Sequence, residues 1–82
     1  MSTAAQDSAP QTAPATTRIV VNGEPRAVAQ NLTLLQFIHF VQLDPERVAV
    51  EMNRRIVKRD AWPATVLEEG TALEIVQFVG GG

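Results

Sequence analysis

A single stretch with the period of an amphipathic helix, set among short β-prone segments, most restricts the folds open to this chain. Four apolar residues recur at the spacing of one helical face, namely Leu34, Phe37, Ile38 and Val41. Thr33 is followed three residues later by Gln36, which is the capping-box pattern of a helix start. Pro45 is expected to stop the helix, because the residue before a proline is pushed out of helical geometry. The pattern predicts one helix with one face on a core.

The segment before this helix predicts a β-hairpin. Residues 18–21 are rich in β-branched side chains and lead directly into Asn22-Gly23. This pair is preferred at the centre of a type I′ turn, because both residues accept positive φ. Residues 25–29 are therefore expected to return as a second strand. Pro25 has no amide hydrogen to donate, so this strand is predicted to lie at an edge of the sheet.

The segment after the helix predicts three more strands. Residues 48–53 are almost continuously apolar, which is typical of a strand in the sheet interior. A short edge strand is expected within residues 54–59. The last strand is expected over residues 73–79, with Leu73 and Ile75 on the face that the helix covers. This order of elements predicts an α+β fold in which one main helix packs across a mixed sheet.

Three larger side chains outside this framework need separate interpretation. Residues 60–63 are expected to form a short helical turn, in which Trp62 packs over one end of the small core rather than stacking on a ligand. Phe40 projects from a different side of the helix and is expected either to cover a loop or to be an exposed contact residue. His39 also lies off the core-facing stripe, and a solvated side chain is expected there, not a catalytic one.

The length of 82 residues allows one small domain. Residues 1–17 are nearly all Ala, Thr, Gln, Ser and Pro. They contain too few large apolar side chains to offset the entropy of ordering, so a disordered N-terminal extension is predicted. This segment has neither the basic start nor the apolar run of a secretory signal. The domain proper is assigned to residues 18–76, and a flexible C-terminal tail to residues 77–82.

The composition argues against several classes of function. The chain has no cysteine and one histidine, so we expect no disulfide, no metal site and no bound cofactor. Its formal net charge of -2 argues against nucleic-acid binding. No segment is long and apolar enough to span a membrane, so no interaction with a membrane is expected. No nucleophile–base pair or phosphate-binding loop is recognisable in the sequence, so the protein is predicted not to be an enzyme. Its predicted location is the cytoplasm.

The segment 54–59 carries four positive side chains around two apolar ones: Arg54, Arg55, Ile56, Val57, Lys58 and Arg59. One interpretation is a turn and a short edge strand whose charges keep the edge from pairing with another chain. The other is a basic patch that meets an acidic partner or the phosphates of a partner's nucleotide. Both interpretations stay open.

The sequence ends in three glycines, Gly80, Gly81 and Gly82. Glycine weakens folded elements, so these residues are expected to stand clear of the domain and to present a main-chain carboxylate on a slim backbone. Glycines at a terminus also fray without any function, which is the simpler interpretation. Phe78 and Val79 continue past the expected end of the sheet, and apolar residues in that position indicate a surface that a partner covers.

The order and spacing of these pieces resemble the ThiS family of sulfur carriers, which have the β-grasp, ubiquitin-like fold. The similarity covers residues 18–82 and is carried by Val21-Asn22-Gly23-Glu24, Thr33-Leu34, Phe37-Ile38, residues 48–53, Ile56-Val57, Arg59, Trp62 and residues 78–82. Two features depart from the family pattern. Residues 1–17 precede the usual first strand, and Lys58 stands where a proline is common.

The resemblance implies a protein co-substrate of thiamin (thiazole) biosynthesis. In the family, the terminal glycine carboxylate is adenylated with ATP by an E1-like adenylyltransferase, ThiF. A sulfur-donating desulfurase system then supplies the sulfur of a thiocarboxylate, and thiazole synthase, ThiG, takes that sulfur. For this chain, the resemblance assigns the reacting carboxylate to Gly82 and access to the partner's pocket to Gly80 and Gly81. It makes Phe78 and Val79 docking contacts.

Three alternatives to this function stay open. A MoaD-type carrier of molybdopterin synthesis has the same fold and a Gly-Gly end. A modifier that is conjugated to lysines of other proteins has such an end too. A β-grasp interaction module without sulfur transfer would use the domain alone, and its glycines would have no chemical role.

Overall fold

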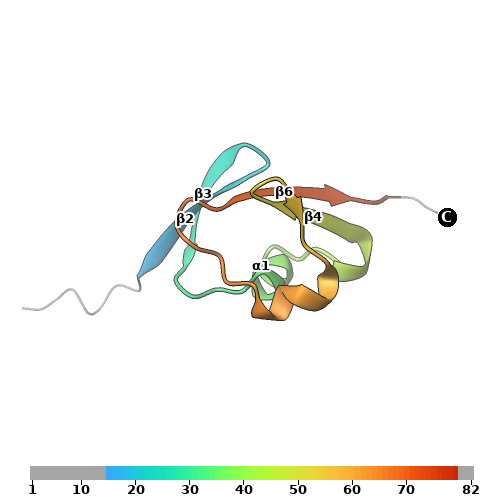
Figure 1. Ribbon diagram of the computed structural model, residues 1–82, viewed down its shortest axis with the longest axis horizontal. Coiled ribbons are helices and arrows are strands. Elements are labelled where there is room, and N and C mark those ends of the chain that lie inside the picture. Colours follow the sequence, from blue (N-terminus) through green and yellow to red (C-terminus); the bar gives the residue numbers. More distant parts are fainter. Residues whose placement is uncertain (1–14, 80–82) are drawn as a thin grey trace, which may run out of the picture.

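A mixed five-stranded sheet lies against one α-helix in the computed structural model, which describes residues 15–79 (Figure 1). The elements follow the chain as β2 (Thr16–Val21), β3 (Glu24–Ala29), α1 (Leu34–Phe40), the 3-10 helix η2 (Pro45–Arg47), β4 (Val48–Met52), β5 (Arg55–Ile56), the 3-10 helix η3 (Arg59–Ala64) and β6 (Ala72–Gln77). The strands lie in the order β3-β2-β6-β4-β5. The predicted α+β fold, with one main helix and a mixed sheet, is confirmed.

The strand order also confirms the predicted positions of individual strands. β3, which contains Pro25, and the short strand β5 form the two edges, and β4 lies inside the sheet. β2 and β3 pair antiparallel across Asn22 and Gly23, whose φ angles are 51° and 85°. Both values are positive, as a type I′ turn requires. β6 pairs parallel with β2 and antiparallel with β4, so the last strand occupies the centre of the sheet.

The start of α1 is fixed by the capping box that the sequence predicts. The Thr33 hydroxyl oxygen accepts a hydrogen bond from the Gln36 N–H at 3.1 Å. In return, the Gln36 Oε1 accepts from the Thr33 N–H at 2.8 Å. Neither amide has an acceptor within the helix itself, so the capping box supplies each with the hydrogen bond that it would otherwise lack.

Replacing Thr33 by alanine is expected to lower the free energy of unfolding by about 1 kcal/mol, because the Gln36 N–H loses its acceptor. Urea denaturation of the variant and the parent measures this difference. Thr33→Ser keeps the hydroxyl and serves as the matched control, which should stay within about 0.5 kcal/mol of the parent. An alanine variant as stable as the serine variant would show that the box contributes nothing.

The end of α1 differs from the prediction that Pro45 stops the helix. The helix ends earlier, where Gln42 takes a left-handed φ of 63°. The Gln42 N–H donates to the His39 carbonyl at 2.9 Å. The Leu43 N–H donates to the Ile38 carbonyl at 3.0 Å, which completes a Schellman motif. Pro45 instead begins η2, where its missing N–H costs nothing.

The core fills the space between the sheet and the layer formed by α1 and η3 (Figure 1). Its buried apolar residues are Ile19, Val28, Leu34, Phe37, Ile38, Val48, Val50, Trp62, Leu67 and Leu73. The predicted helical stripe therefore faces the core, and its last member, Val41, packs against it while partly exposed. Trp62 is buried as predicted, and its indole N–H donates to the Val57 carbonyl at 2.9 Å. Its one polar atom is thereby satisfied.

The folded domain begins earlier than the predicted boundary at residue 18. Thr16 and Thr17 belong to β2 and pair with Ala29 and Val28, and Thr17 is buried. Pairing with β3 supplies hydrogen bonds and burial that the composition of residues 1–17 does not reveal. The rest of the predicted extension, residues 1–14, lies outside the described residues.

Candidate functional site

The candidate site is the carboxyl end of β6, because this strand carries the chain toward the predicted tail. Gln77, the last residue of β6, pairs with Val48 of β4. The Phe78 N–H then donates to the Arg47 carbonyl at 2.7 Å. Val79 lies outside the strand and is 79% exposed. The chain therefore leaves the sheet just after Phe78, at one extreme of the molecule (Figure 1).

The observed end of β6 shifts two predicted boundaries. The last strand was expected over residues 73–79, whereas β6 spans Ala72–Gln77. The predicted tail, residues 77–82, includes Gln77, but the pairing of Gln77 with Val48 makes it part of the sheet. The register with β4 decides this boundary, and that register is not visible in the local sequence.

The Asn22 side chain fixes β6 from the neighbouring hairpin turn. Its Oδ1 accepts from the Ile75 N–H at 2.7 Å, and its Nδ2 donates to the Ile75 carbonyl at 3.2 Å. The Asn22 N–H also donates to the Leu73 carbonyl at 2.8 Å. A side-chain amide offers the same donor and acceptor as a peptide group. It thereby continues the parallel pairing with β6 beyond the last residue of β2.

Asn53 has a matching role at the beginning of β6. Its backbone N–H donates to the Ala72 carbonyl at 2.8 Å, and its Oδ1 accepts from the Ala72 N–H at 3.0 Å. The sequence pattern indicates only a turn residue at Asn22 and a strand residue at Asn53. Nothing in the local pattern reveals contacts with a strand that lies 19 residues away for Asn53 and 53 residues away for Asn22.

Asn22→Gly is expected to lower the free energy of unfolding by about 1–3 kcal/mol, because Ile75 loses both side-chain partners. Glycine retains the positive φ of the turn, so the substitution isolates the hydrogen bonds. Asn31→Gly is the matched control, since Asn31 also has a positive φ, 65°, and lies in the loop before α1. Urea denaturation gives the stabilities, and native-state hydrogen exchange follows the Ile75 amide. Equal losses in both variants would contradict a specific contribution of Asn22.

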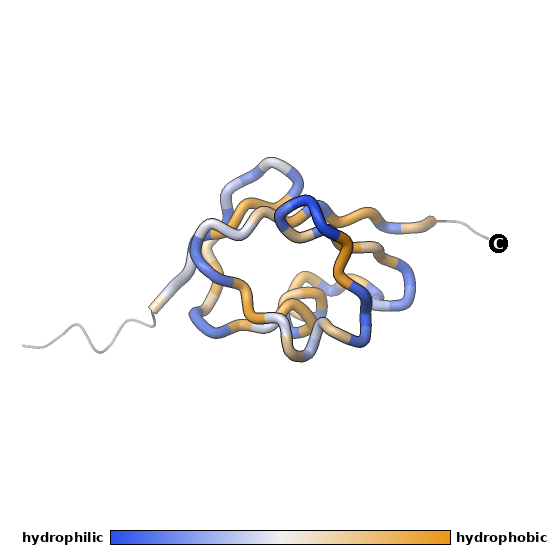
Figure 2. Tube along the Cα trace, in the orientation of Figure 1, coloured by the Kyte–Doolittle hydropathy of each residue, from blue (hydrophilic) through white to orange (hydrophobic). Residues whose placement is uncertain are grey.

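Phe78 and Val79 lie at the surface, as the sequence predicts. Phe78 is 57% exposed and Val79 is 79% exposed. Hydrophobic and hydrophilic colours alternate along β6, and the described chain ends in hydrophobic colour (Figure 2). Their function as docking contacts stays a prediction. The three glycines of the predicted site, Gly80, Gly81 and Gly82, lie outside the described residues, and their roles stay predictions too.

The sheet face opposite α1, called the open face below, adds apolar residues that sequence analysis did not assign to the site. Val76 is 57% exposed and Ile56 is 76% exposed, and both line a shallow hollow of about 120 Å³. Strand alternation places Phe78 on the same face as Val76. The apolar surface therefore continues to the point where the chain leaves the sheet. The alternation of Glu74, Val76 and Phe78 was the signal that could have identified Val76.

The open face also carries a row of charge. Glu51 of β4 pairs directly with Glu74 of β6, and Ile56 of β5 pairs with Glu51 on the other side. Residues that are directly opposite in a sheet point to the same face. The row therefore runs from an exposed isoleucine at the sheet edge to two neighbouring carboxylates at its centre.

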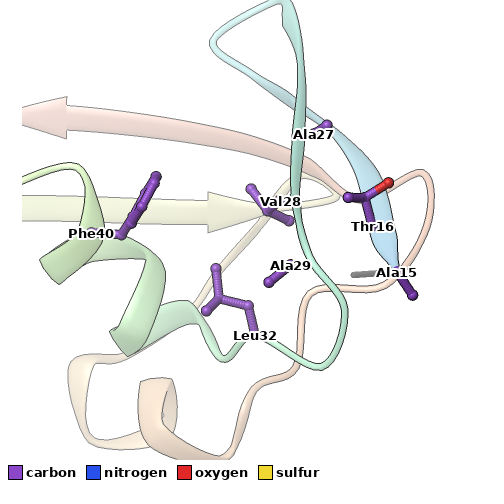
Figure 3. Close-up of a pocket in the computed structure, with 7 residues that line it drawn as sticks. All are labelled: Ala15, Thr16, Ala27, Val28, Ala29, Leu32 and Phe40. Carbon is purple, nitrogen blue, oxygen red and sulfur yellow. The ribbon is translucent and has the colours of Figure 1, made fainter. Parts of the chain in front are cut away.

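Phe40 lies in a different apolar hollow, on the β3 side of the sheet (Figure 3). The side chain is 66% exposed and lines a hollow of about 260 Å³ together with Leu32 and Val28. The Arg26 guanidinium lies 5.9 Å from the centre of the Phe40 ring and 5.6 Å from that of Phe37. Of the two predicted roles for Phe40, its exposure agrees with that of an exposed residue and not with a cover over a loop.

The part of the chain that the structure describes contains no group of three or more His, Asp or Glu side chains placed to hold a metal ion. None of the helices in that same part combines the length and the apolar content that crossing a membrane requires.

Comparison with known proteins gives a family match over nearly all of the folded region. The model of the ThiS family matches residues 19–82. A crystal structure of a thiamine biosynthesis protein (ThiS) from Geobacter metallireducens resembles this structure with a TM-score of 0.70 and 33% sequence identity. The match covers 80% of this chain and 100% of that chain.

Curated relatives fall into two groups. A thiazole synthase of Magnetococcus marinus is 40% identical over 65 residues, which are 79% of this chain and 20% of the relative. A thiazole synthase of Paramagnetospirillum magneticum matches over the same share at 35% identity. The chain thus spans about a fifth of the length of these two synthases. An uncharacterized protein ycf40 of Pyropia yezoensis is 33% identical over 64 residues, which are 78% of this chain and 90% of the relative.

Proposed function

The chain belongs to the ThiS family, and on that premise we propose that it is a sulfur carrier of thiamin (thiazole) biosynthesis. Its role is that of a protein co-substrate, which partner enzymes modify, and not that of an enzyme. The observation that supports this most directly is the exit of the chain from the sheet. β6 pairs with β2 on one side and with β4 on the other. Within residues 15–79 the last backbone hydrogen bond along the chain is donated by Phe78, after which Val79 is exposed. Four residues remain, which can span about 13–14 Å when extended.

This arrangement suits a domain that docks outside a partner while its last residues enter the partner's active site. The domain holds the root of the tail in one direction, because β6 is flanked by β2 and β4. A glycine backbone has no Cβ and needs the least width of any chain segment. Binding energy from the docked domain can then position the carboxylate, as catalysis by proximity requires.

The proposed chemistry has two steps at the Gly82 carboxyl group. An α-carboxyl group has a pKa of about 3.3–3.7 and is ionised at neutral pH. One carboxylate oxygen attacks the α-phosphorus of ATP, and pyrophosphate leaves. A sulfur nucleophile supplied by the desulfurase system then attacks the carbonyl carbon of the acyl adenylate. With a persulfide of the desulfurase system as the nucleophile, AMP leaves with the former carboxylate oxygen and an acyl disulfide forms. A thiol then reduces the S–S bond, which leaves the thiocarboxylate on Gly82 and the donor cysteine in a mixed disulfide with that thiol.

The proposed partners follow from these steps. A ThiF-type adenylyltransferase uses the ATP, a desulfurase system supplies sulfur, and thiazole synthase, ThiG, receives it. The similarity to segments of two thiazole synthases supports the last partner. A relative that joins such a segment to a synthase in one chain keeps the two in permanent proximity. The proposed location is the cytoplasm, where ATP is available.

The surface proposed to dock on these partners starts at Phe78 and Val79 and extends over the open face to Val76 and Ile56. All four side chains are more than half exposed. Exposed apolar side chains that lie next to one another are typical of protein interaction sites.

Intact mass spectrometry tests the proposed function. The purified chain is incubated with ATP, a ThiF-type enzyme and a desulfurase with its sulfur source. The expected product is heavier than the parent by the difference between one sulfur and one oxygen atom. Release of labelled sulfur to thiazole synthase, and not to a molybdopterin synthase, would distinguish the ThiS-type carrier from the MoaD-type carrier.

Three results would contradict the proposal. Transfer of sulfur only to a molybdopterin synthase would indicate a MoaD-type carrier. A covalent bond to lysines of other proteins would indicate a modifier. The absence of both pyrophosphate exchange and a change in mass would indicate a β-grasp interaction module without sulfur transfer.

A further inference from the structure

The basic segment at the β5 edge contains cations that have no carboxylate partner. Two ion pairs occur within residues 15–79, and the only cation of segment 54–59 in either of them is Arg59, which lies 3.8 Å from Glu46. Arg54, Arg55 and Lys58 form no ion pair in that part of the chain. Three uncompensated positive charges therefore lie within five consecutive residues of a chain whose net charge is -2.

Arg54 is held in a backbone conformation that arginine rarely adopts. Asn53 and Arg54 form the turn between β4 and β5, with φ angles of 51° and 72°. In a type I′ turn, glycine is the favoured second residue, because a Cβ makes this conformation costly. Because Arg54 occupies this costly conformation, a functional role for its side chain is indicated.

An open hollow with a mainly apolar wall runs beside β5. Its lining residues are Met52, Asn53, Arg55, Ile56, Val57, Lys58, Asp60 and Ala61. Ile56 is 76% exposed, and Asp60 supplies the one carboxylate among these lining residues. Charges that only keep an edge strand from pairing do not require an exposed isoleucine on that strand.

This edge hollow is continuous with the open face. Ile56 lines it and also lines the shallow hollow that contains Val76. Val76 shares its face with Phe78 by strand alternation. The apolar surface therefore extends from the root of the tail over Val76 to Ile56. At Ile56 it continues around the β5 edge into the hollow that Arg55 and Lys58 line, with Arg55 on the face of Met52.

We propose that the β5 edge docks a segment of the activating enzyme that carries an apolar side chain flanked by carboxylates. The inference rests on the proposed function, since it names a second contact with the partner that adenylates the tail. Charge complementarity identifies the occupant, because Arg55 and Lys58, which form no ion pair within residues 15–79, both line the mainly apolar hollow. Such charges accelerate encounter and fix the register of two surfaces.

Charge reversal separates this proposal from simple protection of the edge. Arg55→Glu in β5 and Lys58→Glu just after it leave this edge of the sheet as highly charged as before, so pairing with another chain stays unfavourable, but they repel a carboxylate partner. Arg26→Glu, on β3 at the opposite edge of the sheet, makes the same change in net charge and is the matched control. Thermal melting confirms that each variant is folded.

The measurement is ATP–pyrophosphate exchange, with the chain as the varied substrate of a ThiF-type enzyme. Each β5 reversal is expected to raise KM about tenfold at low ionic strength, since attraction at an exposed pair becomes repulsion. The value of kcat should not change, because the tail is intact. At about 1 M salt, where the screening length is about 3 Å, the difference from the parent should disappear.

The result that overturns the proposal is a KM for both β5 variants equal to that of the Arg26→Glu control. Neutral variants, Arg55→Ser and Lys58→Ser, add a second criterion. If they self-associate in dilution experiments while keeping the parental KM, the cations only protect the edge, and the proposal is also overturned. A parent chain that dimerises through β5 would assign the edge to a second copy and overturn it as well. If the parent itself is never adenylated, the proposed function fails, which is a separate result.

Discussion

One alanine added after Gly82 is expected to lower the rate of adenylation by at least about 10²-fold, since a displacement of about 1 Å at a reacting centre can already cost that much. The addition moves the carboxylate one residue onward, by about 3.3–3.6 Å, and places a methyl group beside it. The melting temperature is expected to stay the same, because Val79, three residues before Gly82, is already 79% exposed.

Pyrophosphate exchange and intact mass measure the effect of the added residue. The parent should gain the mass difference between sulfur and oxygen after the sulfur donor is added, and the extended chain should gain nothing. An alanine inserted between Met1 and Ser2 adds the same residue mass and leaves the carboxylate in place, so it serves as the control. Thiocarboxylate formation at equal rates in the parent and the C-terminally extended chain would exclude Gly82 as the reacting residue.

Ile38→Ala is expected to lower the free energy of unfolding by roughly 2–5 kcal/mol, whereas Phe78→Ala should cost about 0.5 kcal/mol. Ile38 is fully buried between α1 and the sheet, so truncation leaves a cavity. Phe78 is 57% exposed, and its backbone bond to the Arg47 carbonyl does not depend on the side chain. Urea denaturation of both variants measures the contrast.

The same pair of variants separates folding from docking. Phe78→Ala should raise the KM of the chain as a substrate of the activating enzyme while its stability stays near that of the parent. If Phe78→Ala destabilises the domain as strongly as Ile38→Ala, Phe78 belongs to the core and the proposed docking surface is wrong.

The order of the elements could be predicted because each signal is local. The Thr33 capping box, the helical stripe and Asn22-Gly23 each act within a few residues of their own position. The end of α1 could not be predicted in this way. Gln42 accepts the left-handed conformation of a Schellman motif, although glycine is the residue that usually marks it. Thr16 and Thr17 were missed for a different reason, since only their pairing with β3 makes them part of a strand.

In the candidate site, the residues next to the glycines could be predicted from the sequence, whereas the residues on neighbouring strands could not. Phe78 and Val79 are adjacent to the glycines, and their apolar character is visible in the sequence. The contacts of Asn22 with Ile75 depend on β2 lying next to β6, which is a property of the folded topology. Ile56 was part of a segment interpreted by its charge, so its exposure on the open face became visible only through its pairing with Glu51.

The parallel arrangement of β2 and β6 has a mechanical consequence. Tension applied between Thr16 and the tail acts along both strands in opposite directions. The bonds from the Val20 N–H to the Thr71 carbonyl and from the Asn22 N–H to the Leu73 carbonyl connect the two strands. Because these bonds run across the strands, they carry the load together in shear and do not open one after another. A partner that pulls on the tail along β6 therefore loads all the hydrogen bonds between β2 and β6 at once. The force is transmitted to the sheet without first separating β6 from it.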